Sequence, residues 1–395
     1  MGRRAFQAVR FRRWSALLAV AVIGLGAALL VWMLPDREHQ SAADTRSWEY
    51  PVPHLADDLA PDHRARMESV RDLVCEVMDA HPRSASAVAA LAVLHYLAYD
   101  AENEARCWER CLELDPGSSR ASARLVALAE QRGDHEQIVR LMERAMARPS
   151  ADGYVANRQT LASALRDLRR YDEARAVLEE VAQQAGGSAE FHLLLGDVYS
   201  RLDELEKARE ALEIAVALAP QRGDALYRLS IVCSRLGEDE RAAAYRARFE
   251  ALRTGELASE SAMGARHEME DDAFVATRLA EVLKHAAVAC LEGDDAALAE
   301  RSLLMAVAVH PADAEAHQWL AEFYLRTGGD LAEARRHAEK AVELQPTARA
   351  FLVAAAVAEQ SGDLAGARTA LERAMTLDPG NRDYRVLYDA LSTPR

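Results

Sequence analysis

The sequence predicts an all-α solenoid of repeated helix pairs, preceded by one transmembrane helix. Half of the 395 residues are hydrophobic but only 6% are aromatic, a composition that suits close-packed helices better than a β-sandwich or barrel. A pattern of small residues, apolar residues and prolines returns at a regular interval along most of the chain. A single uncharged, mostly apolar run lies near the N-terminus, at positions 15–34.

Residues 1–34 predict a basic cytoplasmic segment followed by a membrane span. Residues 1–14 contain five arginines and no acid, and residues 15–34 contain no charge. A helix of that length spans about 30 Å, the thickness of the hydrocarbon layer, and Trp14 and Trp32 lie at its ends, where indole rings favour the headgroups. The positive-inside rule then predicts a single-pass membrane protein with its N-terminus in the cytoplasm and its body on the extracytoplasmic (periplasmic) side.

Two other interpretations of this segment stay open. A cleaved signal peptide would use the small residues Ser41-Ala42-Ala43, and a twin-arginine export signal would use Arg12-Arg13. We favour an uncleaved anchor, because the apolar run exceeds the roughly 7–15 residues of a signal core and the small residues lie several polar positions beyond it.

Residues 35–62 contain four prolines and few apolar positions, which predicts a linker. The repeated pattern follows, and its clearest copy is 189–222. Small residues, Gly196, Ala208 and Ala215, stand where two helices must approach closely, and Pro220 cannot continue a helix.

This unit resembles a tetratricopeptide repeat, a helix-turn-helix that is about 34 residues long. Further copies keep the same register at 85–118, 119–152, 155–188, 223–256, 314–347 and 348–381, with a degenerate unit at about 275–311 and a half-unit at about 64–82. The resemblance implies a right-handed α-solenoid whose concave face binds peptides or partner helices.

The repeats are predicted to form two modules. Residues 63–252 form the N-terminal module and residues 273–380 the C-terminal one, and residues 253–272 fit no repeat position and are predicted to be a loop or hinge. Residues 381–395 are predicted to be a capping helix and tail, because Tyr384, Leu387 and Leu391 fall on one apolar stripe.

We expect neither an enzyme, nor a cofactor, nor a metal site. Cys107 and Cys111 share a helix face and, with His95 or Cys75, form a candidate metal site, but packing as small hydrophobic residues is the favoured interpretation. The acidic cluster at 267–272 matches neither HExxH nor an EF-hand loop. No nucleophile-elbow, Walker or haem-attachment motif occurs in the sequence.

The charge distribution argues against a nucleic-acid partner. The net charge is −15 although residues 1–14 are basic, so the body is strongly acidic and repels phosphate. We therefore predict a membrane-anchored scaffold that mediates protein–protein interaction or complex assembly. The alternatives are an assembly factor for secreted or membrane complexes, similar to the cytochrome c maturation chaperones, and a non-catalytic regulatory subunit of an enzyme.

The resemblance also implies that the first helix of each repeat lines the concave groove. Seven inward-facing residues are expected to bind the partner: Gln159, Arg166, Asp197, Arg201, Tyr227, Arg228 and Arg235. They depart from the family's clamp for a peptide's C-terminal carboxylate, which uses lysines and asparagines. A protein or peptide with mixed charge and an apolar anchor fits them better, because arginine makes bidentate contacts with carboxylates.

Overall fold

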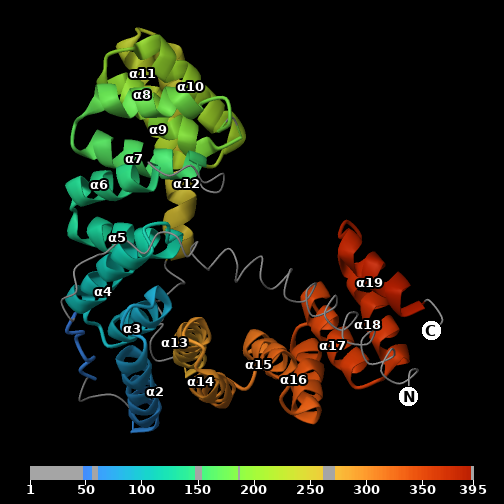
Figure 1. The fold of residues 1–395 in the computed structure, drawn as a ribbon. Coiled ribbons are helices and arrows are strands. Elements are labelled where there is room, and N and C mark those ends of the chain that lie inside the picture. The colour runs from blue at the N-terminus through green and yellow to red at the C-terminus, as the bar shows by residue number, and fades with distance from the viewer. Residues whose placement is uncertain (1–47, 56–60, 147–153, 186, 261–271, 393–395) are drawn as a thin grey trace, which may run out of the picture. The chain divides into compact units, whose positions relative to one another are not determined.

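The computed structural model describes residues 48–55, 61–146, 154–185, 187–260 and 272–392. Within these ranges the chain contains eighteen helices, α2 to α19, and no strand (Figure 1), which confirms the all-helical prediction there. None of these helices combines the length and the apolar character needed to cross a bilayer. The predicted segments 1–14 and 15–34 lie outside the described residues.

The helices form two compact units. Unit 1 contains α2 (Pro61–Ala80), α3 (Ala85–Leu97), α4 (Ala101–Leu114), α13 (Asp272–Glu292), α14 (Ala296–Val309), α15 (Ala314–Thr327), α16 (Leu331–Leu344), α17 (Ala348–Gln360), α18 (Leu364–Leu377) and α19 (Arg382–Ser392). Unit 2 contains α5 (Ser119–Arg132), α6 (His135–Met146), α7 (Tyr154–Asp167), α8 (Tyr171–Val181), α9 (Ala189–Arg201), α10 (Leu205–Leu218), α11 (Gly223–Arg235) and α12 (Asp239–Glu260).

The predicted repeats are present as packed helix pairs, α3 with α4 through to α17 with α18. In the clearest copy, Ala208 and Ala215 of α10 are fully buried. A Cβ atom on Gly196 of α9 would lie 2.6 Å from Cγ of Leu212 and 3.2 Å from the carbonyl oxygen of Ala208. The small residues therefore stand where the two helices come closest, as predicted.

Each pair turns through one residue with left-handed backbone geometry, which closes the first helix and allows the second to begin. Glycine holds this position in four pairs, as Gly133, Gly237, Gly328 and Gly362. Residues with a side chain hold it in the other four, as Tyr99, Arg169, Asp203 and Asp294.

Prolines mark where helices stop, because the residue before a proline disfavours helical geometry. Six helices end two residues before one: α2 before Pro82, α4 before Pro116, α10 before Pro220, α14 before Pro311, α16 before Pro346 and α18 before Pro379.

Part of the predicted linker 35–62 is a packed segment of unit 1. The hydroxyl of Tyr50 donates to Oδ1 of Asp79 on α2 at 2.7 Å, and the Pro51 carbonyl oxygen lies 3.1 Å from Nε2 of His95 on α3. Leu55 is buried. Residues 48–55 of the predicted linker therefore pack on α2 and α3.

The helices are also grouped differently from the two predicted modules. α13, at the start of the predicted module 273–380, packs against α2 and α3 of the predicted module 63–252 (Figure 1). At this junction the hydroxyl of Ser84 donates to Oε2 of Glu292 at 2.8 Å. The reason lies in α3, which is buried around its whole circumference and so needs neighbours besides α4.

The predicted loop 253–272 is shorter than expected, because α12 continues to Glu260 and α13 begins at Asp272. Residues 261–271, with most of the acidic cluster, lie outside the described residues. Asp272 pairs with Arg66, whose Nη2 lies 2.5 Å from its Oδ1.

Within the segment predicted to be a capping helix and tail, α19 packs on α18. Tyr384, Leu387 and Leu391 are buried there, and the tail 393–395 lies outside the described residues.

Candidate functional site

A groove of about 460 Å³ lies in unit 2 along the first helices of two successive repeats, α9 and α11. Five of the seven predicted site residues line it: Asp197, Arg201, Tyr227, Arg228 and Arg235. Ser200, Leu212, Asp224 and Ile231 complete the lining.

Helical spacing explains why these residues meet. Tyr227, Ile231 and Arg235 follow one another at intervals of four along α11, and Asp197 and Arg201 do the same on α9, so each set shares one helix face. α9 contacts both α7 and α11. The first helices of three successive repeats therefore lie side by side, as the resemblance implies.

The base of the groove is a buried carboxylate surrounded by arginines. Asp197 is 6% exposed and accepts a hydrogen bond from Nη1 of Arg228. Nε of Arg201 and Nε of Arg166 each lie 3.9 Å from its carboxylate oxygens. Because a buried carboxylate needs such partners, Asp197 fixes the positions of side chains that reach the groove.

Arg235 lies at the rim of the groove and contacts the end of α9 and the turn that follows it. Its Nη2 lies 2.6 Å from Oδ1 of Asp203, and its Nη1 donates to the Ser200 carbonyl oxygen at 3.0 Å. Asp203 is the left-handed turn residue between α9 and α10. The turn of one repeat therefore orients an arginine of the next.

Two large apolar side chains remain accessible between these charges. Tyr227 is 50% exposed and Ile231 is 39% exposed. The ring of Tyr227 packs against Phe249 of α12, with their centroids 5.3 Å apart. The groove thus offers an apolar platform flanked by guanidinium groups.

The two remaining predicted site residues lie on α7. Arg166 reaches the Asp197 carboxylate, and it also donates to Oδ1 of Asp167 at 2.8 Å. Gln159 is half-buried and does not line the groove. Sequence reasoning missed Ile231, although its spacing of four from Tyr227 was a usable signal.

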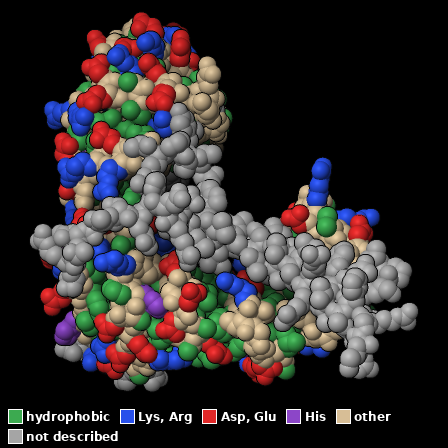
Figure 2. All heavy atoms as spheres, viewed as in Figure 1, with side chains coloured by type: hydrophobic (Ala, Val, Ile, Leu, Met, Phe, Trp, Pro, Cys, Tyr) green, Lys and Arg blue, Asp and Glu red, His purple; other side chains and the backbone are tan. Residues whose placement is uncertain are grey.

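Acidic and basic side chains are interleaved over the visible surface of unit 2 (Figure 2). Arg175 bridges from α8 to Glu204 at 2.6 Å, and Arg209 of α10 pairs with Glu238. This pattern differs from the continuous basic patch that marks a nucleic-acid interface.

Unit 1 contains a related arginine–carboxylate pair. Glu322 is the ninth residue of α15, as Asp197 is of α9. Nη2 of Arg349 on α17 lies 3.2 Å from its Oε1, and Nε2 of Gln318 donates to the same atom at 2.9 Å. Burial raises the pKa of Glu322, and the Arg349 charge opposes that shift. Both units therefore link successive first helices through an arginine and a carboxylate that is mostly shielded from solvent.

The cysteines have the environment of packed side chains. The thiol of Cys111 donates to the Ala85 carbonyl oxygen at 3.4 Å, and burial raises the pKa of Cys107 to about 12. None of the five cysteines forms a disulfide. In the part of the chain that the structure describes, no group of three or more histidine, cysteine and acidic residues is placed to hold a metal ion.

Two family models of the tetratricopeptide repeat match the chain, at residues 165–229 and 327–382. The chain therefore contains tetratricopeptide repeats, and the first match includes α9 and α10 of the groove. No curated protein matches the sequence.

Several solved structures are similar to parts of the chain. A crystal structure of MamA is 18% identical, covers 41% of this chain and 94% of its own, and has a TM-score of 0.38. The MamA 41-end structure from Desulfovibrio magneticus RS-1 is 18% identical, with 48% and 96% covered and a TM-score of 0.38. The structure of Naa15/Naa10 bound to HypK-THB is 16% identical, with 84% and 59% covered and a TM-score of 0.36.

Proposed function

We propose that this protein is a membrane-anchored, non-catalytic scaffold that binds a protein partner in the unit 2 groove. The observation that carries the proposal is the exposed pair Tyr227 and Ile231 between Arg201 and Arg235. Aromatic residues and arginines are the side chains that most often dominate protein interfaces. The tetratricopeptide repeats at 165–229 support the same interpretation.

The groove chemistry defines the partner. An apolar side chain on the Tyr227–Ile231 platform would lose contact with water, and a carboxylate beside it would accept hydrogen bonds from Arg201 or Arg235. The partner is therefore a peptide or helix that presents an apolar anchor next to an acidic residue.

Photocrosslinking tests the groove assignment in the full chain. A photoreactive amino acid replaces Ile231 in the groove or, as a matched control, Ile214 on α10, which is 42% exposed and does not line the groove. We expect a crosslinked protein at position 231 that is absent at 214. Crosslinking at 214 alone would place the partner on another face.

We further propose that residues 15–34 anchor the protein, with the N-terminus in the cytoplasm and the body outside it. The uncharged run and the preceding arginines support this proposal. Because residues 48–55 pack on α2 and α3, only positions 35–47 separate the span from packed structure. A segment of that length reaches at most about 45 Å when fully extended, which would keep unit 1 near the membrane.

A fusion reporter tests this topology. We expect a reporter that is active only outside the cytoplasm to work when it follows Arg395, and the purified protein to retain its N-terminus. An inactive reporter, or a mature chain that begins near Asp44, would contradict the anchored topology.

A further inference from the structure

Two histidines meet inside one repeat of unit 1. His317 of α15 is 5% exposed and His337 of α16 is 1% exposed. Their Nδ1 atoms are 2.8 Å apart, a hydrogen-bond distance at which one ring must donate and the other must accept.

The contacts of the two Nε2 atoms determine which nitrogen of each ring carries the proton. Nε2 of His317 lies 3.2 Å from the Pro311 carbonyl oxygen, which can only accept. Nε2 of His337 lies 3.0 Å from Nη2 of Arg336, which can only donate. His317 is therefore protonated at Nε2 and accepts at Nδ1, and His337 is protonated at Nδ1. One chain of hydrogen bonds results, from Arg336 through both rings to Pro311.

Within this chain of hydrogen bonds, no atom is left to accept a hydrogen bond from an additional proton. A protonated histidine donates from both nitrogens, so charging His317 would bring two N–H groups face to face at Nδ1. Charging His337 would also direct an N–H at the Arg336 guanidinium. Either event breaks the hydrogen bond between the two rings.

Charged groups of both signs surround the two rings. Arg336 and Lys340 of α16 are positive, and Glu333 of α16 and Asp313 before α15 are negative. The carboxylate of Glu333 is 3.7 Å from Nε2 of His337, and the ring of Tyr324 lies 6.4 Å from that of His337.

The net effect of these surroundings favours neutral rings. Burial, followed by the Arg336 charge, lowers the pKa of His337 to about 4, and burial also lowers the pKa of His317.

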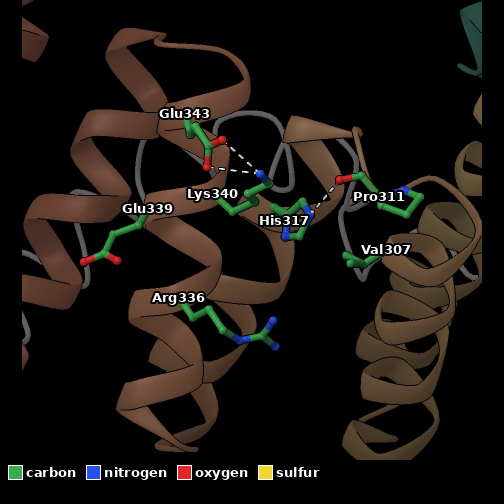
Figure 3. A pocket seen from close by; sticks show the side chains of 7 residues that line it. All are labelled: Val307, Pro311, His317, Arg336, Glu339, Lys340 and Glu343. Atoms are coloured by element: carbon green, nitrogen blue, oxygen red, sulfur yellow. Dashed lines mark hydrogen bonds and ion pairs between the residues drawn. The ribbon is translucent and has the colours of Figure 1, made fainter.

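His317 also borders a pocket of about 520 Å³ whose other lining residues include Arg336, Glu339, Lys340 and Glu343. Figure 3 shows His317 directed at the Pro311 carbonyl, with the charged side chains of α16 beside it. The pair is buried, but one of its rings lies at the wall of a charged depression.

We propose that the His317–His337 pair is a pH-sensitive contact between α15 and α16. It holds the two helices together when both rings are neutral, and it lets the helices separate locally when a ring is protonated. An exposed histidine titrates near pH 6.5, above the pKa of the buried rings. The closed state therefore binds fewer protons than the opened one. Its stability is complete above about pH 6.5 and falls as the pH drops towards about 4.

Amide hydrogen exchange on the full chain measures this opening at pH 7 and pH 5, after correction for the intrinsic exchange rate at each pH. Between pH 7 and pH 5, the protection of peptides from α15 and α16 is expected to fall about 20-fold. This factor follows from one histidine whose pKa is 6.5 when exposed and about 4 when buried. Peptides of α10 and α11, which contain no histidine, are the internal control. Equal changes in both sets, or no change in α15 and α16, would overturn the proposal.

His337→Asn provides the variant test. Its amide can donate to Nδ1 of neutral His317 or rotate to accept from protonated His317, so the pH dependence in α15 and α16 should disappear. Retention of the wild-type pH dependence in this variant would contradict the assignment.

Nitrogen NMR of histidine-labelled wild-type protein checks the same assignment without a substitution. We expect Nε2–H on His317 and Nδ1–H on His337 at pH 7. Rings that titrate near pH 6.5, or that carry the opposite tautomers, would overturn the proposal.

Discussion

At the residue scale, the left-handed turn position shows where this chain tolerates strain. The backbone φ is +67° at Gly133 and +62° at Arg169, and both residues join the two helices of a repeat in unit 2. Glycine adopts this conformation freely, whereas a residue with a Cβ atom loses about 1 kcal/mol there. Equivalent turns therefore differ in stability because only some of them place a residue with a Cβ atom in the left-handed conformation.

Reciprocal substitutions test this difference. An added Cβ on Gly133 meets no atom within 4 Å, so Gly133→Ala isolates the backbone cost and should destabilise unit 2 by about 1 kcal/mol. Arg169→Gly should stabilise it by a similar amount. Urea unfolding of the full chain measures both shifts, and shifts of the same sign would refute the turn argument.

At the element scale, helix pairs depend on close contact at small residues. Gly196→Ala would push a Cβ atom into Leu212 and towards the Ala208 backbone, so the two helices must separate at a cost of about 1–3 kcal/mol. Gly187→Ala is the matched control, because an added Cβ there meets nothing within 4 Å. A thermal melt should show a clear loss for the first variant and little change for the second. Equal melting of the two would contradict the close contact between α9 and α10.

Much of each repeat could be predicted from sequence because its signals are local. Small residues, apolar spacing and terminal prolines all record contacts within one helix pair, as in α9 and α10. The packing of α13 on α3 could not be predicted in this way. The apolar residues around α3 indicate that every face is buried, but not which distant helix buries it.

The helix face that forms the candidate groove could also be predicted from the sequence, but the pairing of its side chains could not. Repeat register placed Tyr227 and Arg235 on the expected face, and both line the groove. The pairing of Arg228 with buried Asp197 needed side-chain geometry, because it joins residues 31 positions apart. Arg228 therefore serves the stability of the groove as well as its surface, and a substitution there would strand a buried charge.

At the scale of the whole molecule, the packing of α13 on α2 and α3 predicts how a cut chain behaves. A site for a sequence-specific protease is introduced within 261–271, and the chain is cleaved in native buffer. The two fragments should co-elute in size-exclusion chromatography and separate only in denaturant, because α13 stays packed on α2 and α3. Separate elution in native buffer would support two independent modules instead.

The central claim is that the unit 2 groove binds the partner. The most direct test uses a synthetic peptide of the partner segment that crosslinks to the groove. This peptide is titrated against four variants. Ile231→Thr and Arg201→Gln change the groove, and Ile214→Thr and Lys207→Gln change residues of similar exposure on α10. Each groove variant should raise the Kd about tenfold, which corresponds to about 1.4 kcal/mol, and each α10 variant should leave it unchanged. Weaker binding by the α10 variants with wild-type binding by the groove variants would contradict the account.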